Sequence, residues 1–486
     1  MTLPIPDIGW APLWPPLLLL ITASVGLLFA LFRPGGRSVA LLSLLGLAGA
    51  LVVNLILFQQ GRSGEAESGF GLRYLADLPA TGFNFVILLG TALAILLSYD
   101  YLERSDLDHP EYYPLMLFAA TGAMVMAAAG DFIVLLLGLE IMSLAVYVLS
   151  AWRHSRQSEE AGMKYFLLGA FASAIFIYGI ALLYGATGAF HYAGIASSLT
   201  GPGGELLLAS LGGVLILGGL AFKAALAPFH QWAPDVYTGA PTPVTAFMSV
   251  VVKAAAFAAL LRVAALFFPE LSSLVSVALA VLVALTMVIG NFAALLQRGV
   301  KRMLAYSAVA HAGYLGLAVL AAGTVGIRAA LWYLAAYTLT NIGAFAVLVL
   351  LGDRDDRGDD LGHLAGLGRQ RPGLALAMTL FLLSLAGIPP LAGFMGKVLV
   401  FQAAIEAGYL WLAILGIVTS VVAVAYYFRV ITYMYFREPE QTPPEFRSRA
   451  TGLAIGLAAL GTVLFGIFPG WWLQLISTGQ RLIAGL

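Results

Sequence analysis

Apolar stretches of about 20 residues recur along the whole 486-residue sequence, and no other feature limits the fold as strongly. A helix needs about 20 mostly apolar residues to cross the hydrocarbon core of a bilayer. The chain is 61% hydrophobic and 10% charged, whereas soluble domains carry about 25% charged residues. The sequence therefore predicts an all-α integral membrane protein.

About fourteen such spans lie between polar, glycine or proline breaks. Their approximate ranges are 11–32, 38–59, 82–101, 113–129, 131–151, 163–186, 206–232, 242–267, 271–295, 303–322, 328–351, 374–402, 410–435 and 450–475. The largest predicted loops are 60–80, 187–205, 352–373 and 436–449, and nothing remains for a soluble domain. The first residues lack the basic region of a cleavable signal peptide, so we expect none.

Composition excludes several kinds of site. The sequence has no cysteine, which excludes disulfides and zinc or iron–sulfur sites with cysteine ligands. It has no P-loop and no dinucleotide-binding fingerprint, because the GPGG at 201–204 does not follow a strand. The formal net charge is zero, which gives no indication of a nucleic-acid partner. We expect no cofactor and no metal in this chain.

Basic residues divide unequally between the two sets of predicted loops. One side carries Arg33, Arg37, Arg104, Arg153, Arg156, Arg298, Lys301, Arg302, Arg354, Arg357, Arg369, Arg371, Arg437, Arg447 and Arg449. The other side carries only Arg62, Arg73, Arg262, Arg328 and Arg481. Because loops rich in arginine and lysine stay in the cytoplasm, the first side is predicted to be cytoplasmic. Both termini are then expected to face the periplasm, and the number of spans is even.

The order of the spans suggests an internal repeat. Segments 113–267 and 271–435 each contain five predicted helices. A unit with an odd number of spans, followed by its copy, crosses the membrane in the opposite sense, as in inverted-repeat transporters. We therefore expect two inverted five-helix units, preceded by three spans in 1–112 and followed by a loop and a last span in 436–486.

The fourth helix of each five-helix unit combines a lysine with helix-breaking prolines. The first unit has Lys223 and Pro228, and the second has Pro389 and Pro390 followed by Lys397. Irregular backbone at membrane depth is tolerated only against protein or a water-filled cavity. We expect each break to admit the water with which the nearby amine exchanges protons, although a kink used only for packing is the alternative.

Lysine and arginine are used in different parts of the chain. Only five lysines stand against twenty arginines, and four of them lie in or beside predicted spans: Lys164, Lys223, Lys253 and Lys397. Arginine stays protonated, whereas a buried lysine can lose its proton, as a proton carrier must. The alternative is snorkelling of the amine to the interface, which suits Lys164 better than the three deeper lysines.

Glu140 is the only carboxylate deep within a predicted span, and its surroundings LLLGLEIMSLAVY are apolar. An isolated ion at mid-membrane costs about 2.5–3.5 kcal/mol on insertion scales. A lysine close by would offset much of this cost, and Lys223 is the preferred partner. Such a pair could act as a switch, since separating it would release the lysine proton. A static pair that only fixes helix packing is the alternative.

Other polar residues allow two interpretations each. His230 and His311 could shuttle protons, because histidine titrates near neutrality, or could be satisfied core residues. Arg429 is interpreted as structural, through pairing or snorkelling, and Asp235 as a loop or capping carboxylate. The acidic run at 353–360 is predicted to be a solvated cytoplasmic loop, and the tryptophans at 471–472 an interfacial belt.

Five segments of the sequence resemble a known family. They read GDFIVLLLGLEIMSLAVYVL, EEAGMKYFLLGAFASAIFIYGIALLYGATG, LAFKAALAPFHQWAPDVYTGAPTPVTAFMSVVVKAAAFAALLR, QRGVKRMLAYSAVAHAGYLGL and SLAGIPPLAGFMGKVLVF. These are similar to the antiporter-like membrane subunits shared by bacterial proton-pumping NADH–quinone oxidoreductase (respiratory complex I) and multi-subunit cation/proton antiporters. The resemblance covers about 113–435, and KYFLLGAFASA points to the subunit N branch.

The resemblance assigns roles to individual residues. It matches the family's glutamate and broken-helix lysine to Glu140 and Lys223, and the next lysine to Lys253. It matches the second broken-helix group to Lys397, a position at which one sister subunit has glutamate. It matches the supporting positions Lys164 and His311, whereas His230 is a supporting candidate only because it lies just past the first helix break. By this resemblance a proton would pass from the cytoplasm near Lys223 along Lys253 and His311, and leave outward from Lys397.

The resemblance also implies the context of the chain. It implies a proton-translocating, non-redox subunit in the bacterial inner membrane, bound to other membrane and peripheral subunits that carry NADH, FMN, iron–sulfur clusters and quinone. Two other functions remain possible from the sequence. The chain could belong to a cation/proton antiporter complex, or it could be a non-catalytic scaffold whose buried charges only hold helices together.

Overall fold

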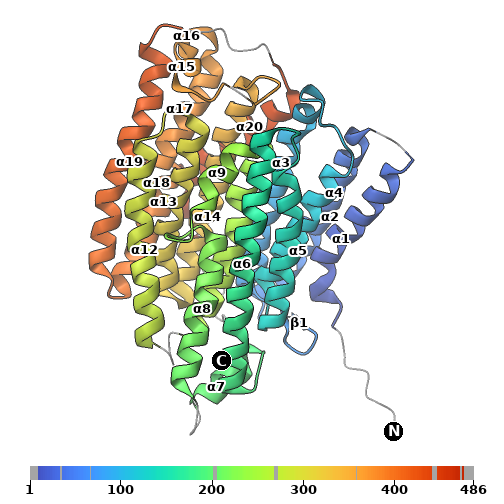
Figure 1. Cartoon of the computed structure of the whole chain (residues 1–486), viewed down its shortest axis with the longest axis vertical. Coiled ribbons are helices and arrows are strands. Elements are labelled where there is room, and N and C mark those ends of the chain that lie inside the picture. Colours follow the sequence, from blue (N-terminus) through green and yellow to red (C-terminus); the bar gives the residue numbers. More distant parts are fainter. Residues whose placement is uncertain are drawn as a thin grey trace.

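The computed structural model describes residues 9–32, 35–65, 67–200, 205–267, 272–356, 358–439, 446–470 and 473–474. Its helices run side by side along the long axis of the molecule (Figure 1). Among the described residues, twelve helices are long and apolar enough to cross a membrane, and Tyr112–Ala128 and Pro372–Ala386 are shorter apolar helices. The predicted all-α membrane class is confirmed, and the helix count agrees with about fourteen spans.

The N-terminal part contains three long helices and a small hairpin. Its elements are η1 (Ala11–Leu13), α1 (Trp14–Ala30), α2 (Gly36–Arg62), β1 (Glu67–Gly69), β2 (Tyr74–Ala76) and α3 (Leu78–Arg104). The antiparallel hairpin, in which Ser68 lies opposite Leu75, occupies the predicted 60–80 loop and was not expected. Asp77 then starts α3, because its side chain accepts a hydrogen bond from the Ala80 N–H at 2.9 Å.

The next part corresponds to the predicted unit 113–267. It contains α4 (Tyr112–Ala128), α5 (Phe132–Ser150), α6 (Arg156–Thr187), α7 (Tyr192–Thr200), α8 (Leu206–Ala224), α9 (Trp232–Gly239), α10 (Thr242–Phe247), the π-helical turn η2 (Met248–Val252) and α11 (Lys253–Phe267). Asp131 and Ser155 begin α5 and α6 as N-caps. The short helix α7 lies in a segment predicted to be a loop.

The second unit and the C-terminal part contain α12 (Ser272–Leu295), α13 (Val300–Ala321), α14 (Gly323–Leu351), α15 (Leu361–Leu364), α16 (Leu367–Gln370), α17 (Pro372–Ala386), α18 (Ala392–Glu406), α19 (Leu410–Phe436) and α20 (Arg449–Ile467). Helices α15 and α16 lie within the predicted 352–373 loop. Helix α20 packs back against α14 and α3. The two-unit division and its inverted symmetry stay predictions.

Two predicted spans are interrupted where the sequence places proline. Helix α8 ends at Ala224, followed by Ala225 with φ +58°, and α9 begins only at Trp232. Helix α17 ends at Ala386, followed by Gly387 with φ +87°, and α18 begins at Ala392. The Ala227–Pro228 and Pro389–Pro390 peptide bonds are cis. All three prolines are exposed on the surface of this chain.

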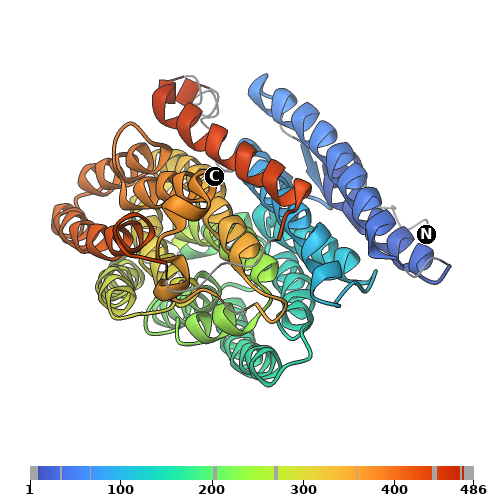
Figure 2. The ribbon, with the colours of Figure 1, turned by 90° about the horizontal axis from the view of Figure 1, so that it is seen from above.

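Burial separates the centre of the bundle from its edge. The most apolar part of α14 is 100% buried and that of the continuous α10–η2–α11 segment (Thr242–Phe267) is 94% buried, whereas in α2 only 28% is buried. Seen from above, α1 and α2 form an outlying pair at one edge (Figure 2). The helices around Lys253 therefore pack against protein, while the N-terminal pair presents apolar side chains outward.

Contacts between loops support the predicted grouping of basic residues. At one end, Arg104 donates to the Gly352 carbonyl at 2.8 Å and Arg153 to the Arg354 carbonyl at 3.1 Å. At the other end, Arg73 pairs with Asp131. Assigning Arg262 to a loop was wrong, because it is 2% exposed within α11. Arg33, Arg357, Arg481, Trp471, Trp472 and the GPGG segment lie outside the described residues.

We expect the close crossing of α4 and α5 to tolerate no larger side chain. A Cβ atom on Gly122 would lie 2.6 Å from the Gly138 carbonyl oxygen and 3.0 Å from the Met142 Cα. Gly122→Val should therefore destabilise the chain by about 1–3 kcal/mol, as overpacking does. The control is Gly49→Val, since no atom of the described residues lies within 4 Å of a Cβ there. Thermal unfolding in detergent compares them, and equal unfolding temperatures would contradict the expectation.

Candidate functional site

Lys223 lies in the last turn of α8, before the first helix break, and is 2% exposed. Its amine donates a hydrogen bond to the Tyr147 hydroxyl at 3.1 Å. It also lies over the rings of Tyr147 and Tyr165, 4.9 and 5.1 Å from their centroids. The amine is thus held by a neutral hydroxyl and two aromatic faces, which stabilise a cation without a carboxylate.

Glu140 does not form the expected ion pair with Lys223. No carboxylate oxygen of Glu140 lies within 4.0 Å of a basic group among the described residues, and its Oε1 instead accepts a hydrogen bond from the Ser173 hydroxyl at 2.6 Å. Glu140 is half-buried, and its neighbours Leu137 and Ile141 are exposed. It therefore lies toward the outer face of α5, whereas Lys223 points inward to Tyr147.

Lys253 lies at the centre of the bundle, 1% exposed, where the π-helical turn η2 passes into α11. Its amine donates to the Ala308 carbonyl of α13, and its other neighbour is the Tyr337 ring, 5.9 Å away. Single π-helical turns inside α-helices occur often at functional sites. The amine of Lys253 thus lies beside both α13 and α14.

His311 on α13 lies between tyrosines and is 4% exposed. Its Nδ1 is 2.6 Å from the Tyr333 hydroxyl and its Nε2 is 3.2 Å from the Tyr427 hydroxyl. A cavity of about 10 Å³ opens beside the ring, toward Thr340, Ser384 and α18. Such a volume is close to the roughly 10–15 Å³ that one water needs.

Lys397 on α18 donates a hydrogen bond to a carbonyl that has lost its helical N–H donor at the second helix break. In an uninterrupted helix the Ala386 carbonyl would accept from the N–H of residue 390, but Pro390 has none. The Lys397 amine donates to the Ala386 carbonyl at 2.8 Å and to the Ser420 hydroxyl at 2.6 Å. It lies 5.2 Å from the centroid of the Tyr314 ring. The proline and the lysine are therefore structurally coupled.

Lys164 lies apart from the buried lysines, with a side chain that is 41% exposed. It pairs with Glu160 at 2.7 Å and with Asp235 at 2.9 Å. Arg302 also pairs with Asp235 at 2.9 Å. Interpreting Asp235 as a loop or capping carboxylate was wrong, because it lies within α9 and joins α6 to α13 through two cations.

His230 lies in the first helix break and is half-buried, and its Nδ1 has no hydrogen-bond partner in the described part of the chain. No described contact joins it to His311. Arg429 donates to the carbonyls of Leu295 and Gln297 at 2.9 and 2.5 Å, so it caps the end of α12 as a structural residue. Among the described residues, no group of three or more acidic or histidine side chains could hold a metal ion.

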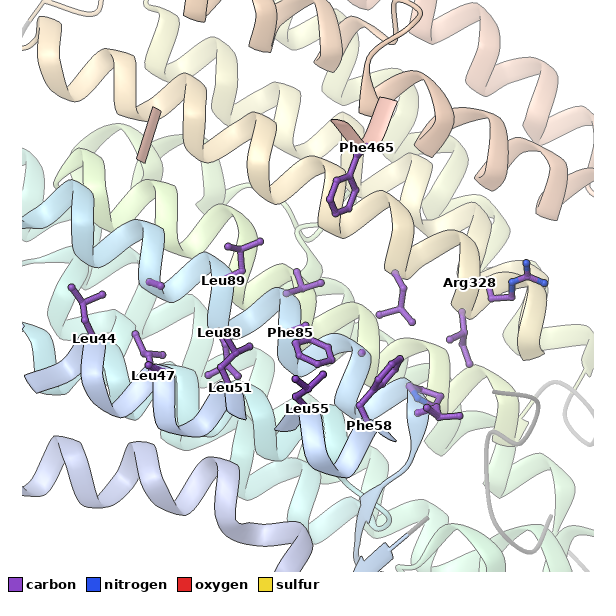
Figure 3. A pocket seen from close by; sticks show the side chains of 18 of the residues that line it. Leu44, Leu47, Leu51, Leu55, Phe58, Phe85, Leu88, Leu89, Arg328 and Phe465 are labelled. Atoms are coloured by element: carbon purple, nitrogen blue, oxygen red, sulfur yellow. The ribbon is translucent and has the colours of Figure 1, made fainter. Parts of the chain in front are cut away.

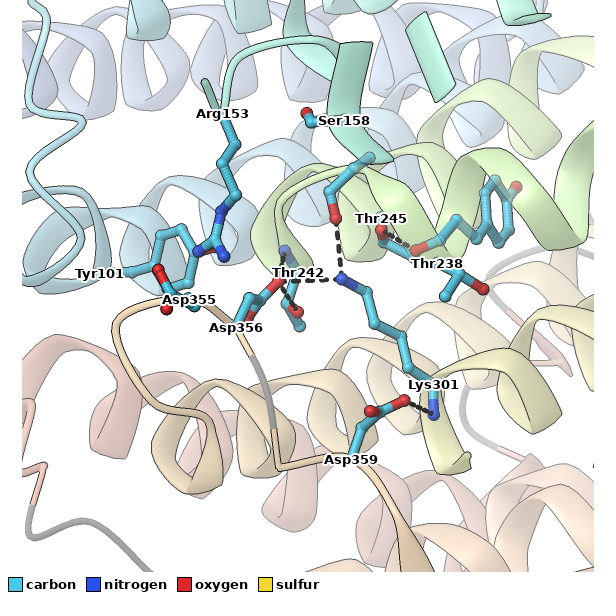
Figure 4. Close-up of polar contacts among 12 residues, drawn as sticks. Tyr101, Arg153, Ser158, Thr238, Thr242, Thr245, Lys301, Asp355, Asp356 and Asp359 are labelled. Atoms are coloured by element: carbon cyan, nitrogen blue, oxygen red, sulfur yellow. Dashed lines mark hydrogen bonds and ion pairs between the residues drawn. The ribbon is translucent and has the colours of Figure 1, made fainter. Parts of the chain in front are cut away.

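The acidic run at 353–360 was predicted to be solvated, and this was wrong for Asp356. Its side chain is 8% exposed and pairs with the buried Lys301 at 2.9 Å. It also accepts from the Thr242 N–H at 3.0 Å and the Thr242 hydroxyl at 2.7 Å. Lys301 donates in addition to the Ala240 carbonyl at 2.8 Å. Figure 4 shows how these groups join the loop to α10 and α13.

The balance of charges around Asp356 favours its ionised form. Burial alone raises the pKa of this carboxyl group. The charges of Lys301 and Arg153, with the hydrogen bonds from Thr242 and Lys301, outweigh burial, and the pKa lies below its ordinary value. The sequence gives little indication of this site, because the partners are 55 and 114 positions away.

A second buried ion pair joins α11 to the start of α3. Arg262 donates to the two carboxylate oxygens of Asp77 at 2.9 and 2.5 Å, and its Nε donates to the Ala127 carbonyl at 2.8 Å. This bidentate geometry is the strong form of an arginine–carboxylate pair. Arg262 within an apolar run was the signal in the sequence that could have revealed this pair.

Sequence comparisons connect this arrangement to known proteins. The family described as NADH:quinone oxidoreductase/Mrp antiporter, TM, matches residues 129–423. NADH-quinone oxidoreductase subunit N of Trichlorobacter lovleyi is 45% identical, with 96% of each chain covered. The protein of the same name from Deinococcus radiodurans is 42% identical, with 100% of each chain covered.

Two solved structures have the same fold as this chain. A chain of respiratory complex I from Thermus thermophilus with bound aureothin superposes with a TM-score of 0.83 at 41% identity, covering 96% of this chain and 100% of that one. A chain of the Mrp complex from Dietzia has a TM-score of 0.83 at 22% identity, covering 98% of this chain and 97% of that one. The second likeness shows a shared fold alone.

We expect Asp356 to stabilise the chain in a pH-dependent way. Because its folded pKa lies below the ordinary value of about 3.9, its contribution is complete above that value and is lost as the pH falls through the folded pKa. Asp356→Asn should therefore cost up to about 3–5 kcal/mol at neutral pH, since Lys301 is left buried without a carboxylate.

The measurement is the thermal unfolding temperature in detergent between pH 3 and pH 8. The loss in Asp356→Asn should shrink below pH 4, where the wild-type carboxyl group is also becoming protonated. Asp360→Asn is the matched control, because Asp360 is exposed in the same loop. A loss in Asp356→Asn that did not depend on pH, or that Asp360→Asn equalled, would contradict the role of this charge.

Proposed function

The chain belongs to the NADH:quinone oxidoreductase/Mrp antiporter transmembrane family, and on this basis we propose that it is a proton-translocating membrane subunit of an NADH–quinone oxidoreductase. In this proposal the chain moves protons and performs no redox chemistry. Electron transfer takes place in other subunits, and its energy reaches this chain as a change in the field around its buried charges.

The observation that carries the proposal is the burial of three lysines among neutral hydrogen-bond partners. Lys223, Lys253 and Lys397 are each at most 5% exposed. Their hydrogen-bond acceptors are a tyrosine hydroxyl, a serine hydroxyl and backbone carbonyls. Among the described residues, none of them forms an ion pair. An amine in such a site has no carboxylate in direct contact to retain its proton, and lysine, unlike arginine, can release one.

The groups between Lys253 and Lys397 are suited to passing a proton. His311 lies between them. The centroid of its ring is 5.0 Å from that of the Tyr337 ring and 5.8 Å from that of the Tyr314 ring. These two tyrosine rings also lie beside the amines of Lys253 and Lys397, respectively. Histidine can accept a proton on one nitrogen and donate from the other, since both of its nitrogens already face hydroxyl groups.

We assign the steps as follows. A proton from the cytoplasm reaches Lys223, moves to Lys253 and His311, and leaves to the outside from Lys397. Glu140 and Lys164 set the proton affinity of Lys223 without touching it, and His230 assists at the first break. The half-buried position of Glu140 supports this role, because a carboxylate near the outer face of α5 can sense a charge on a neighbouring subunit.

The proposal extends to location and composition. The chain would lie in the bacterial inner membrane with both termini in the periplasm, bound to the other membrane and peripheral subunits. NADH, FMN, iron–sulfur clusters and quinone would bind to those subunits and not to this chain. The relatives that support it are named NADH-quinone oxidoreductase subunit N, which favours this function over a cation/proton antiporter.

We expect Lys223→Met to leave assembly intact and to reduce proton uptake at least about tenfold, because a positioned proton-transfer group is removed. Lys223→Arg should fail in the same way, since arginine keeps the charge but does not release its proton. The measurement uses the intact complex in sealed vesicles. It compares assembly on a native gel, NADH oxidation by an artificial acceptor, quinone reduction and proton uptake.

The three interpretations of the chain give different results. A redox-coupled pump assembles, reduces the artificial acceptor normally and loses quinone reduction together with proton uptake. A scaffold loses assembly in Lys223→Met. Normal assembly with quinone reduction and proton uptake unchanged in both variants would overturn the proposed mechanism. Copurification without flavin or iron–sulfur subunits would instead assign the chain to an antiporter complex.

A further inference from the structure

A deep apolar groove runs along the N-terminal edge of the bundle, away from the lysines. Its walls come from α2, α3, α14 and α20, and its volume is about 570 Å³. Helix α3 packs against both α2 and α14 and so lies between them. Figure 3 shows the apolar side chains of α2 and α3 in a row along the groove, with Phe465 from α20 nearby and Arg328 at one end.

The groove has the direction and length of a lipid tail. It extends along α2 from Leu44 to Phe58 and along α3 from Ala92 back to Leu78. Fourteen helical positions correspond to about 21 Å, which is more than half of the roughly 30 Å hydrocarbon core. The groove is therefore long enough to receive an acyl chain from one leaflet, lying along the membrane normal.

The chemistry of the walls favours an acyl chain over a protein helix. Thirteen of the nineteen lining residues are leucine, phenylalanine, valine or isoleucine, and only Thr324 and Arg328 carry polar side chains. Helices that associate within membranes do so mainly through small residues and hydrogen bonds between side chains. Large flexible side chains offer neither feature, but they fit the irregular shape of a hydrocarbon chain.

The polar end of the groove carries one cation. Arg328 lies near the start of α14 and is half-exposed. It lines the groove together with Leu78, the first residue of α3, and Phe58, one turn before the end of α2, so it sits where the hydrocarbon core meets the headgroups. No hydrogen bond or ion pair joins its guanidinium group to the described part of the chain. A guanidinium group binds phosphate oxygens through paired N–H donors.

We propose that this groove binds a phospholipid, with an acyl chain between α2 and α14 and the lipid phosphate on Arg328. The lipid would lie over α3, with α2 on one side and α14 and α20 on the other. The proposal is independent of proton transfer, since none of the groove residues is a hydrogen-bond or ring partner of the lysine and histidine groups described above.

Photocrosslinking in the intact, purified complex tests this proposal. The probe is a phosphatidylglycerol that carries a diazirine in one acyl chain and an alkyne for recovery, and labelled peptides are identified by mass spectrometry. In the wild-type chain, labelling should concentrate on 44–58 and 78–92. Leu51→Trp, which narrows the groove, should reduce this labelling. Leu45→Trp should not, because Leu45 is 71% exposed on α2 outside the groove.

Two substitutions of Arg328 test whether its positive charge binds the lipid phosphate. Arg328→Gln should reduce groove labelling by the probe about fivefold, the value of one basic residue near an anionic headgroup. Arg328→Lys should restore most of the labelling. Because Arg328 is half-exposed and unpaired, both variants are expected to fold even if Leu51→Trp does not.

Three results would overturn the proposal. Labelling spread evenly over the exposed apolar surface, and unchanged in Leu51→Trp and Arg328→Gln, would mean that the lipid contact is unspecific. Labelling of the exposed face of α19 without labelling of the groove would mean that a partner subunit covers the groove. Displacement of the probe by a long-chain quinone, with no dependence on Arg328, would assign the groove to quinone.

Discussion

The arrangement of the chain depends on one constraint, which is the burial of amines inside a membrane without carboxylates. Lys223, Lys253 and Lys397 are enclosed by the bundle, and each must find acceptors there. The interrupted helices supply part of the answer, because a proline removes a helical N–H and leaves a carbonyl available. Lys397 uses the carbonyl of Ala386 in this way. The Ala308 carbonyl, the hydroxyls of Ser420 and Tyr147, and aromatic rings supply the rest. The breaks, the π-helical turn before Lys253 and the aromatic residues around His311 can all be understood as consequences of this constraint.

Buried charges in the described part of the chain fall into two groups with different chemistry. Arg262 with Asp77 and Lys301 with Asp356 are complete ion pairs, and each joins helices near one end of the bundle. These pairs fix structure, because removing either partner would leave a charge alone in an apolar site. The three central lysines have only neutral partners, and their charge is not fixed in this way. We infer that the paired charges hold the frame within which the unpaired amines can change their protonation.

Much of this architecture follows from the sequence. Apolar runs of spanning length predict the helices, and Pro228, Pro389 and Pro390 predict where two of them are interrupted. The three deep lysines stand out because the loops use arginine. The sequence could not show which residues the buried charged side chains contact. The helical periodicity of the sequence alone did not show that Glu140 lies toward the outer face of α5. Arg262 was assigned to a loop because its partner Asp77 is 185 positions away. The acidic run at 353–360 has the composition of a solvated loop, and only the packing of the loop against Lys301 buries Asp356. The symmetry of the two units and the roles of the site residues stay predictions.

The protonation states of the five lysines test most directly whether the buried amines carry protons. Nitrogen NMR of the complex, with ¹⁵N-lysine introduced into this chain alone, distinguishes an ammonium from a neutral amine, and lysine-to-arginine variants assign each line. We predict that the lines of Lys223, Lys253 and Lys397 move between the two forms over the pH range in which the complex works. The lines of Lys164 and Lys301, which are paired with carboxylates, should stay ammonium throughout. Five lines that all stay ammonium over this range would contradict the claim that the buried amines carry protons.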